Sequence, residues 1–294
     1  MLAFAANSLL ICLAFVNTSI DEVSFTVIRI LTGAITLLTI LIVQGEKVEK
    51  LTIIDGISTL LLFTYAVSFS FAYRSIDAGV GALILFATAQ LMMILCGLLR
   101  GERTNFFGIC VALLGFILFL MPTASFPPIV ASLLMIVSGL AWGGFSLLGK
   151  SSHSPVVSTA SCFLLSIPLS LLLLLFFHEN LQFDLNGIFY ATLSGSLASG
   201  IGYALWYWIR VRMTTINAGA GIVQLSVPIL SAILGLLILE EEITLRSAIA
   251  AVIVLIGVSI VTLTTKMVDN IDPVNNSVYL PFIKCDRLGG HRTQ

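Results

Sequence analysis

A few polar and aromatic residues interrupt long apolar stretches of this chain and could recognise a small solute. They are Asn7, Gln90, Trp142, Tyr203 and Gln224. Amide, hydroxyl and indole groups form hydrogen bonds, and aromatic rings offer flat apolar faces. Polar side chains are costly inside a membrane, so they mark either binding sites or hydrogen bonds between helices. These residue types predict a polar, aromatic-lined cavity, with interhelical hydrogen bonding as the alternative.

The same sequence lacks the groupings that catalysis or metal binding would need. No nucleophile stands beside a general base, and the cysteines are scattered without metal-binding spacing, at positions 12, 96, 110, 162 and 285. No Asp or Glu stands near the middle of an apolar run, which argues against a proton relay built on a buried carboxylate. We therefore expect no enzyme activity, no metal and no cofactor.

One short match to a phosphate-binding motif has a simpler explanation. Residues 144–151 read G-F-S-L-L-G-K-S, which fits the pattern G-x-x-x-x-G-K-S. A true phosphate loop follows a strand, whereas these letters end a long apolar stretch. Lys150 is better explained as a positive charge at the inner membrane surface, so nucleotide binding is disfavoured.

The composition indicates an all-α integral membrane protein. Of the 294 residues, 58% are hydrophobic and 10% are charged, and the mean hydropathy is +1.09; a soluble domain carries about 25% charge. A spanning helix needs about 20 apolar residues. Breaking the chain at its charges predicts ten transmembrane helices, at 2–16, 23–43, 53–73, 78–99, 105–121, 128–149, 155–177, 185–209, 217–239 and 245–265. The first is short, so we expect the true start upstream of Met1; a mismatched short span is the alternative.

Lysines and arginines gather in alternate connections and predict the orientation of the chain. With the N-terminus inside, the inner loops contain Lys47, Lys50, Arg100, Arg103, Lys150, Arg210 and Arg212. The outer loops contain only Arg74 and Arg246. Because positive charge favours the cytoplasmic side, we expect a multi-pass inner-membrane protein with both termini cytoplasmic.

Two segments of the chain match without a gap and indicate an internal duplication. Residues 76–104 align with 216–244, so that Gly79, Gly81 and Glu102 recur as Gly219, Gly221 and Glu242. Five helices per copy is an odd number, so the second copy must insert upside down relative to the first. We expect two inverted five-helix repeats, 1–121 and 128–265, followed by a polar, mobile cytoplasmic tail, 266–294.

The paired glycines at 79, 81, 219 and 221 open the fourth and ninth predicted helices. They could make room for a solute and allow bending, or they could be points of close helix packing. Pro228 lies in the middle of the ninth predicted helix, where it would remove a backbone hydrogen bond and kink the helix. Together these residues are candidates for a gate or hinge.

Arg29 is the only charge clearly inside a predicted helix. It lies about two turns from the outer end of its helix, so it could extend outward or meet Asp21 or Glu22. We expect a membrane anchor, and a clamp on the substrate is the alternative.

Small residues spaced by four, such as Gly139 and Gly143, would let helices approach closely. We expect them to serve packing within the bundle; a homodimer face is the alternative.

The combined arrangement resembles the EamA type of the drug/metabolite transporter superfamily. The motifs are F-A-A-N-S-L-L at 4–10, S-F-T-V-I-R at 24–29 and A-W-G-G-F-S at 141–146, together with the repeated A-G-x-G openings. The resemblance is closest to the YddG-like branch, which exports aromatic amino acids. It implies a central cavity between the two halves that includes Asn7, Gln90, Trp142, Tyr203 and Gln224. One departure is Thr88, which stands opposite Pro228 where the family often has proline.

We therefore predict a secondary transporter that exports amino acids or similar small metabolites by alternating access. Its expected partners are a small-molecule substrate and the lipid bilayer, with no nucleic acid. The rival hypothesis is a non-transporting membrane protein that packs with or regulates a partner.

Overall fold

The computed structural model is helical in every segment of regular structure that it describes. It describes residues 1–46, 52–99, 105–120, 128–149, 155–206, 226–241 and 244–271. The helices are α1 (Leu2–Asn17), α2 (Glu22–Gln44), α3 (Ile53–Tyr73), α4 (Ala78–Leu99), α5 (Phe106–Leu120), α6 (Ile129–Gly149), α7 (Pro155–Phe176), α8 (Leu185–Leu193), α11 (Ser226–Ile238) and α12 (Leu245–Ile271). A 3-10 turn, η1 (His178–Asn180), precedes α8, and a π-helix, η2 (Ser194–Ile201), follows it.

Six of the described helical segments are long and apolar enough to cross a membrane. They are Glu22–Gln44, Ile53–Tyr73, Ala78–Cys96, Ile129–Gly149, Val156–Phe176 and Leu185–Trp206. Shorter apolar helices cover Leu2–Asn17, Phe106–Gly115, Ser226–Ile238 and Ala248–Val261. The predicted all-α class is thus confirmed for the part of the chain that the structure describes, and these six helices are consistent with an integral membrane protein.

Local sequence explains where several helices begin and end. The Asp21 carboxylate accepts hydrogen bonds of 2.9 Å from the N–H groups of Val23 and Ser24, which satisfies the open start of α2. Thr52 and Asp55 form a reciprocal capping box at the start of α3. Gly45 ends α2 with φ of 69°, a left-handed conformation that glycine adopts without strain.

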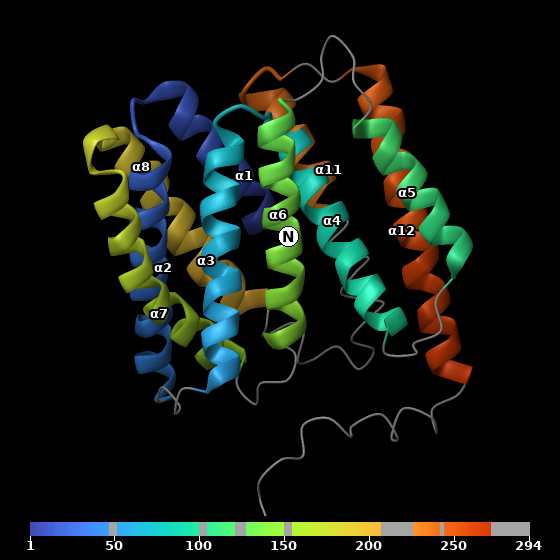
Figure 1. Cartoon of the computed structure of the whole chain (residues 1–294), viewed down its shortest axis with the longest axis horizontal. Helices are drawn as coiled ribbons and strands as arrows, with labels where there is room; N and C mark the ends of the chain where they lie inside the picture. Colours follow the sequence, from blue (N-terminus) through green and yellow to red (C-terminus); the bar gives the residue numbers. More distant parts are fainter. Residues whose placement is uncertain are drawn as a thin grey trace, which may run out of the picture.

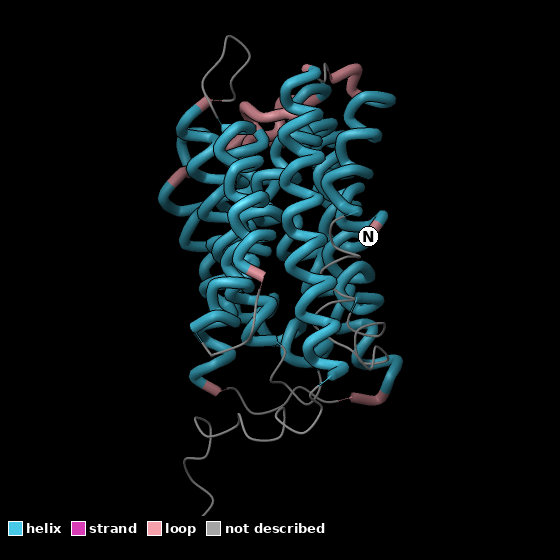
Figure 2. Tube along the Cα trace, turned by 90° about the vertical axis from the view of Figure 1, so that its right-hand side faces the viewer, coloured by secondary structure: helices cyan, strands magenta, loops and turns pink. Residues whose placement is uncertain are grey.

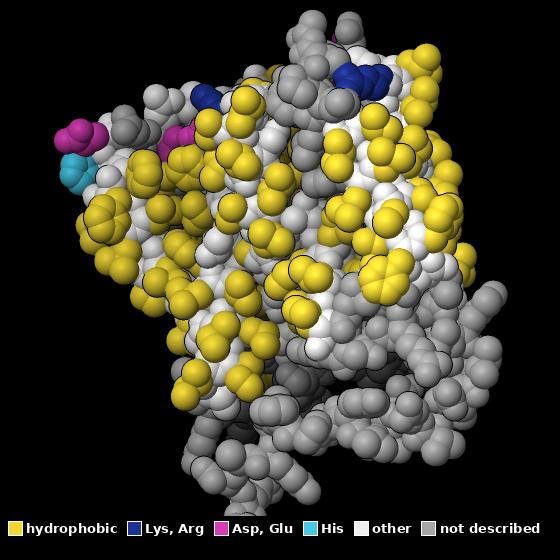
Figure 3. Space-filling model, turned by 45° about the vertical axis from the view of Figure 1, so that its right-hand side comes forward, with side chains coloured by type: hydrophobic (Ala, Val, Ile, Leu, Met, Phe, Trp, Pro, Cys, Tyr) yellow, Lys and Arg dark blue, Asp and Glu magenta, His cyan; other side chains and the backbone are white. Residues whose placement is uncertain are grey.

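The helices stand side by side in one bundle, and most of them run along a common direction (Figures 1 and 2). The two predicted halves are interleaved, because α3 packs against α6 and α7 while α1 packs against α8, η2 and α11. Hydrophobic side chains cover the face seen in Figure 3, and the described charged side chains in that view gather near one end of the bundle. A lipid-facing surface of this kind is what a membrane protein requires.

The π-helix η2 brings the chain close to α2. A Cβ atom on Gly195 would collide with the Thr32 hydroxyl and the Arg29 carbonyl oxygen, so only glycine permits this approach. π-helical turns are rare and often occur at functional sites. Here η2 places Ser199 beside the side chain of Arg29, since the Arg29 Nε–H donates to Ser199 Oγ at 3.3 Å.

Helices α5 and α12 form a pair at one side of the bundle (Figure 1). Their contact depends on glycines: a Cβ on Gly115 would lie 2.7 Å from the Val254 nitrogen, and one on Gly257 would collide with the Ala112 backbone. This close approach is typical of membrane helices that pack through small residues.

We predict that Gly257→Leu will separate α5 from α12 and lower the stability of the folded protein by about 1–3 kcal/mol, the usual cost of overpacking. Thermal unfolding of the purified protein in detergent measures this loss. Gly56→Ala is the control, because nothing lies within 4 Å of the Cβ position at the exposed Gly56. Equal stability of the two variants would show that the α5–α12 contact does not matter.

Candidate functional site

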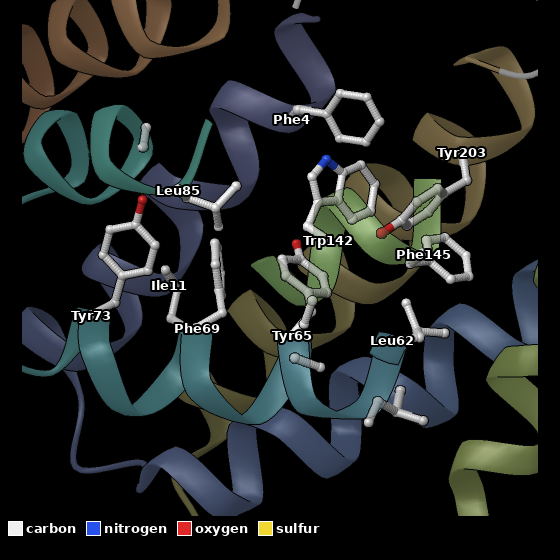
Figure 4. Close-up of a cluster of buried hydrophobic side chains, with 14 of the residues drawn as sticks. Phe4, Ile11, Leu62, Tyr65, Phe69, Tyr73, Leu85, Trp142, Phe145 and Tyr203 are labelled. Atoms are coloured by element: carbon white, nitrogen blue, oxygen red, sulfur yellow. The ribbon is translucent and has the colours of Figure 1, made fainter. Parts of the chain in front are cut away.

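A buried aromatic cluster lies where elements from both predicted halves meet. Trp142 of α6 is at its centre, with ring centroids 5.1 Å from Tyr65 and 5.2 Å from Tyr203. Phe4 of α1 contacts both Trp142 and Tyr203, at 5.9 and 5.7 Å. Phe145 contacts both Trp142, at 5.9 Å, and Tyr203, at 6.2 Å. Figure 4 shows these rings converging, with the Tyr65 hydroxyl pointing toward Trp142.

Helix periodicity explains how α3 contributes to this cluster. Tyr65, Phe69 and Tyr73 are spaced by four, which places them along one face of α3. Neighbouring rings contact each other at 5.5 Å and 4.6 Å. Close packing brings α6 into position, because a Cβ on Gly139 would lie 2.8 Å from the Cβ of Thr88 on α4.

The structure brings Trp142 and Tyr203 together, as a shared cavity wall would require. Both side chains are buried, at 3% and 2% exposure. The Trp142 indole N–H has no hydrogen-bond acceptor among the described residues. Because a buried donor without an acceptor is costly, this group is suited to bind an acceptor on a solute.

The other three predicted site residues have different outcomes. Asn7 is buried on α1, and its Oδ1 accepts a hydrogen bond of 2.5 Å from Ser194 Oγ, so it joins α1 to η2. This bond fits the interhelical alternative for Asn7. Gln90 is buried on α4. Gln224 lies outside the described residues.

Arg29 is not the outward-reaching anchor that we expected. Its side chain is only 2% exposed, and its Nη2 donates to the Tyr65 hydroxyl at 2.7 Å. The guanidinium carbon lies 4.7 Å from the Phe69 ring centroid and 5.1 Å from that of Tyr65, within the range of cation–π contact. The expectation was wrong because Glu22 pairs instead with Arg74, at 3.2 Å, and Asp21 caps α2. Arg29 is therefore part of the buried site.

The described members of the proposed hinge set are closely packed. A Cβ on Gly79 would lie 2.9 Å from the Ala232 Cα on α11, and one on Gly81 would collide with the Tyr73 ring. Pro228 is buried in the first turn of the described part of α11, which starts at Ser226. Gly219 and Gly221 lie outside the described residues. Close packing thus explains Gly79 and Gly81, and a hinge role stays a prediction.

A carboxylate after α11 joins that helix to the start of α4. Glu241 accepts hydrogen bonds from the N–H groups of Ala78, at 2.5 Å, and Gly79, at 3.3 Å. Glu240 precedes it with φ of 54°, a left-handed conformation that turns the chain at this point. Negative charge is favourable at a helix N-terminus. The contact therefore links the end of α11 to the start of α4, where Gly79 lies.

Burial raises the pKa of Glu241 above its ordinary value, and the negative charge of Asp77 adds to the shift. The two backbone N–H groups oppose it, since they stabilise the ionised form. Burial also raises the pKa of Asp77. The electrostatic cost of the ionised Glu241 is thus only partly offset by the start of α4.

The site residues predicted from the sequence did not include Tyr65, Phe4 and Phe145. The spacing of Tyr65, Phe69 and Tyr73 is the signal that could have identified α3. Ser199 and Arg29 are 170 residues apart, so no local pattern connects them.

The arrangement combines hydrogen-bond donors with aromatic faces, which are the groups that the predicted solute site requires. The buried polar groups in and beside the cluster are an indole N–H, phenol hydroxyls and the Arg29 guanidinium, which lies over the Tyr65 and Phe69 rings. Among the described residues, no group of three His, Cys, Asp or Glu side chains comes together in a way that could hold a metal ion.

Comparison with known proteins gives a consistent family. Residues 129–263 match the EamA-like transporter family. The chain is 44% identical over 265 residues to an uncharacterized protein of Pseudomonas aeruginosa, covering 89% of this chain and 91% of that protein. It is 27% identical to an uncharacterized transporter of Archaeoglobus fulgidus, covering 77% and 83% of the two chains, and 20% identical to the uncharacterized transporter YoaV of Bacillus subtilis, covering 83% and 88%. A solved crystal structure shares the fold, with a TM-score of 0.64, 16% identity, and 90% and 97% of the two chains covered.

We predict that Glu241→Gln will flatten the dependence of stability on pH. Because the folded pKa of Glu241 is raised above 4.5, protonation stabilises the folded protein, and this contribution is lost as pH rises through the raised value. The Glu241→Gln side chain cannot titrate, so the variant should lose the part of the pH dependence of stability that Glu241 contributes.

Thermal unfolding in detergent between about pH 4.5 and 8 measures the difference. Glu240→Gln is the matched control, since Glu240 is exposed and forms no hydrogen bond to α4 among the described residues. Identical pH profiles for wild type and Glu241→Gln would contradict the prediction.

Proposed function

The chain belongs to the EamA-like transporter family and is a multi-pass membrane transporter, and from this premise we propose that it exports amino acids or similar small metabolites by alternating access. The observation that carries the proposal is the buried cluster around Trp142. Its rings and polar groups come from α1 and α3 of the first predicted half and from α6 and the helix after η2 of the second. A site between two halves can face either side when the halves rearrange.

The pattern of helix contacts supports two equivalent five-helix repeats, and the odd number of helices in each supports their inversion. In the two proposed repeats, α3 corresponds to α8 with η2, and α6 corresponds to α1. The α3–α6 contact therefore corresponds to the contact of α1 with α8 and η2, and both contacts are present. Similarly, α2 corresponds to α7, so the contact of α2 with η2 corresponds to the contact of α3 with α7, and both contacts are present. The contacts of α2 with α7, α4 with α11 and α5 with α12 each map onto themselves. We therefore propose ten spans in two repeats, 1–121 and 128–265.

We further propose an inner-membrane location with both termini cytoplasmic, which the distribution of lysine and arginine supports. The tail, 266–294, would then lie in the cytoplasm, and its described first turns continue α12 to Ile271. A homodimer remains a prediction from the small-residue spacing.

The glycine-rich openings of the fourth and ninth proposed spans are the proposed gate. Gly79 packs against α11, and its N–H also donates to Glu241. Movement of α4 relative to α11 would therefore change both the packing contact and the hydrogen bond. Gly219, Gly221 and Pro228 are the proposed counterpart in the other half.

The proposal predicts saturable counterflow of labelled amino acids into liposomes that contain the purified protein. A panel led by Phe, Tyr and Trp is the first choice because aromatic side chains fit against the rings around Trp142. Uptake should require unlabelled solute inside the liposomes and should compete with excess unlabelled solute outside. Absence of flux for every amino acid and related metabolite tested, with folded protein inserted, would favour the non-transporting alternative.

We also predict that Gln224→Ala will lower transport of the accepted solute by about tenfold while membrane insertion stays normal, because one hydrogen bond to the solute is lost. Initial counterflow rates, divided by the amount of inserted protein, measure the effect. Gln44→Ala is the matched control, since Gln44 is exposed at the end of α2. Wild-type rates for Gln224→Ala would remove Gln224 from the site.

A further inference from the structure

Arg29 carries a positive charge into the interior of the bundle without a carboxylate beside it. Within the described residues, no Asp or Glu forms an ion pair with Arg29. Described carboxylates near the helix ends are engaged elsewhere: Asp21 caps α2, Glu22 pairs with Arg74, Asp55 caps α3, and Glu241 binds the start of α4. A buried charge is normally paired, so the site lacks the anion that would complete it.

The unused part of the guanidinium is one edge. Arginine has five N–H donors; Nε donates to Ser199 and Nη2 donates once to Tyr65. Nη1 is fully buried and has no acceptor among the described residues. Nη1 and the second N–H of Nη2 thus remain as donors that Ser199 and Tyr65 do not use, and a guanidinium can present two N–H groups side by side to the two oxygens of a carboxylate.

The surroundings hold this edge in a fixed orientation. Phe69 and Tyr65 lie within cation–π range of the guanidinium, and the bonds to Ser199 and Tyr65 fix its two ends. Ser199 is itself positioned by η2, which Gly195 allows to approach α2. A rigid guanidinium loses little entropy when it binds an anion.

The same edge is connected to the aromatic cluster. Tyr65 bonds to Arg29 through its hydroxyl, and its ring contacts that of Trp142 at 5.1 Å. Trp142 contributes a second buried donor without an acceptor among the described residues. Two unsatisfied donors thus flank one tyrosine, and a solute rich in acceptors would satisfy both.

We propose that Arg29 is the anion-binding residue of the transport site and that the solute carries a carboxylate, which Arg29 binds through both oxygens while the rest of the solute packs against the rings of Tyr65 and Trp142. This inference rests on the proposed function and makes it more specific. It excludes amines and neutral amides of otherwise similar shape as good substrates.

Ligand-induced thermal stabilisation of the full-length protein in detergent tests the proposal separately from transport. The probes are L-phenylalanine, L-tyrosine, L-leucine and phenylacetate, each compared with the amide that replaces its carboxylate, and phenyl phosphate. Phenylacetate and phenylacetamide form the pair without an amino group. At least one carboxylate should raise the unfolding temperature at concentrations where its amide does not. Failure of every carboxylate, equal effects of acid and amide, or stabilisation by phenyl phosphate alone would overturn the carboxylate assignment.

Substitutions connect the effect to Arg29. Arg29→Gln should weaken the apparent affinity for the carboxylate by about 10- to 100-fold, and Arg29→Lys should weaken it less while keeping the protein folded, because it retains the charge but not the paired donors. Arg74→Gln is the matched control, since Arg74 is partly exposed and pairs with Glu22. If both Arg29→Lys and folded Arg29→Gln bind the carboxylate with the wild-type apparent affinity, the proposed role of Arg29 is wrong.

Counterflow of the same probes separates the two proposals. Carboxylate-selective stabilisation that depends on Arg29, without flux, would support the binding site and contradict the transporter function. Flux that is equal for acids and amides would support the transporter and contradict the carboxylate site.

Discussion

Burial of the Arg29 guanidinium between α2, α3 and η2 is the constraint on which much of this core depends. A charge in an apolar interior is costly unless its donors and faces are occupied. Tyr65 and Ser199 accept two of its hydrogen bonds, and aromatic rings lie within cation–π range. The Ser199 bond requires η2 to approach α2 at Gly195, where any side chain would collide with Thr32. The π-helix η2, Gly195 and Tyr65 thus all contribute to the environment that holds the buried Arg29 guanidinium.

Close helix contacts then determine what can move. The cluster around Trp142 joins elements of both proposed halves, so a rearrangement of the halves would change the contacts between these rings. Helices α5 and α12 pack chiefly against each other, at one side of the bundle (Figure 1). The pair adds membrane-facing surface but places no residue among the described members of the cluster.

The contact of Glu241 with the start of α4 shows how helix ends contribute electrostatically. The open N–H groups at the start of a helix carry partial positive charge. Glu241, which follows α11, accepts hydrogen bonds from two such groups at the start of α4. This bond holds α4 and α11 together where both lie near the proposed gate. Its strength depends on protonation, because burial and Asp77 oppose the ionised form that the N–H groups favour.

Much of the fold follows from the sequence because helix formation in a membrane depends on local properties. Apolar run length, capping residues such as Asp21 and Thr52, and the glycine at position 45 act within a few residues, so α1 to α7 begin and end near their predicted bounds. The predicted end at 265 was wrong for α12, which continues to Ile271. The repeated motif and the aromatic residues Trp142 and Tyr203 were likewise visible in the sequence. Partner choice was not: Asn7 bonds to Ser194, 187 residues away, and Arg29 to Ser199, 170 residues away. Only the tertiary structure could decide that Arg29 turns inward, since a long cationic side chain can reach either the membrane surface or the core and the available partners determine which is lower in energy.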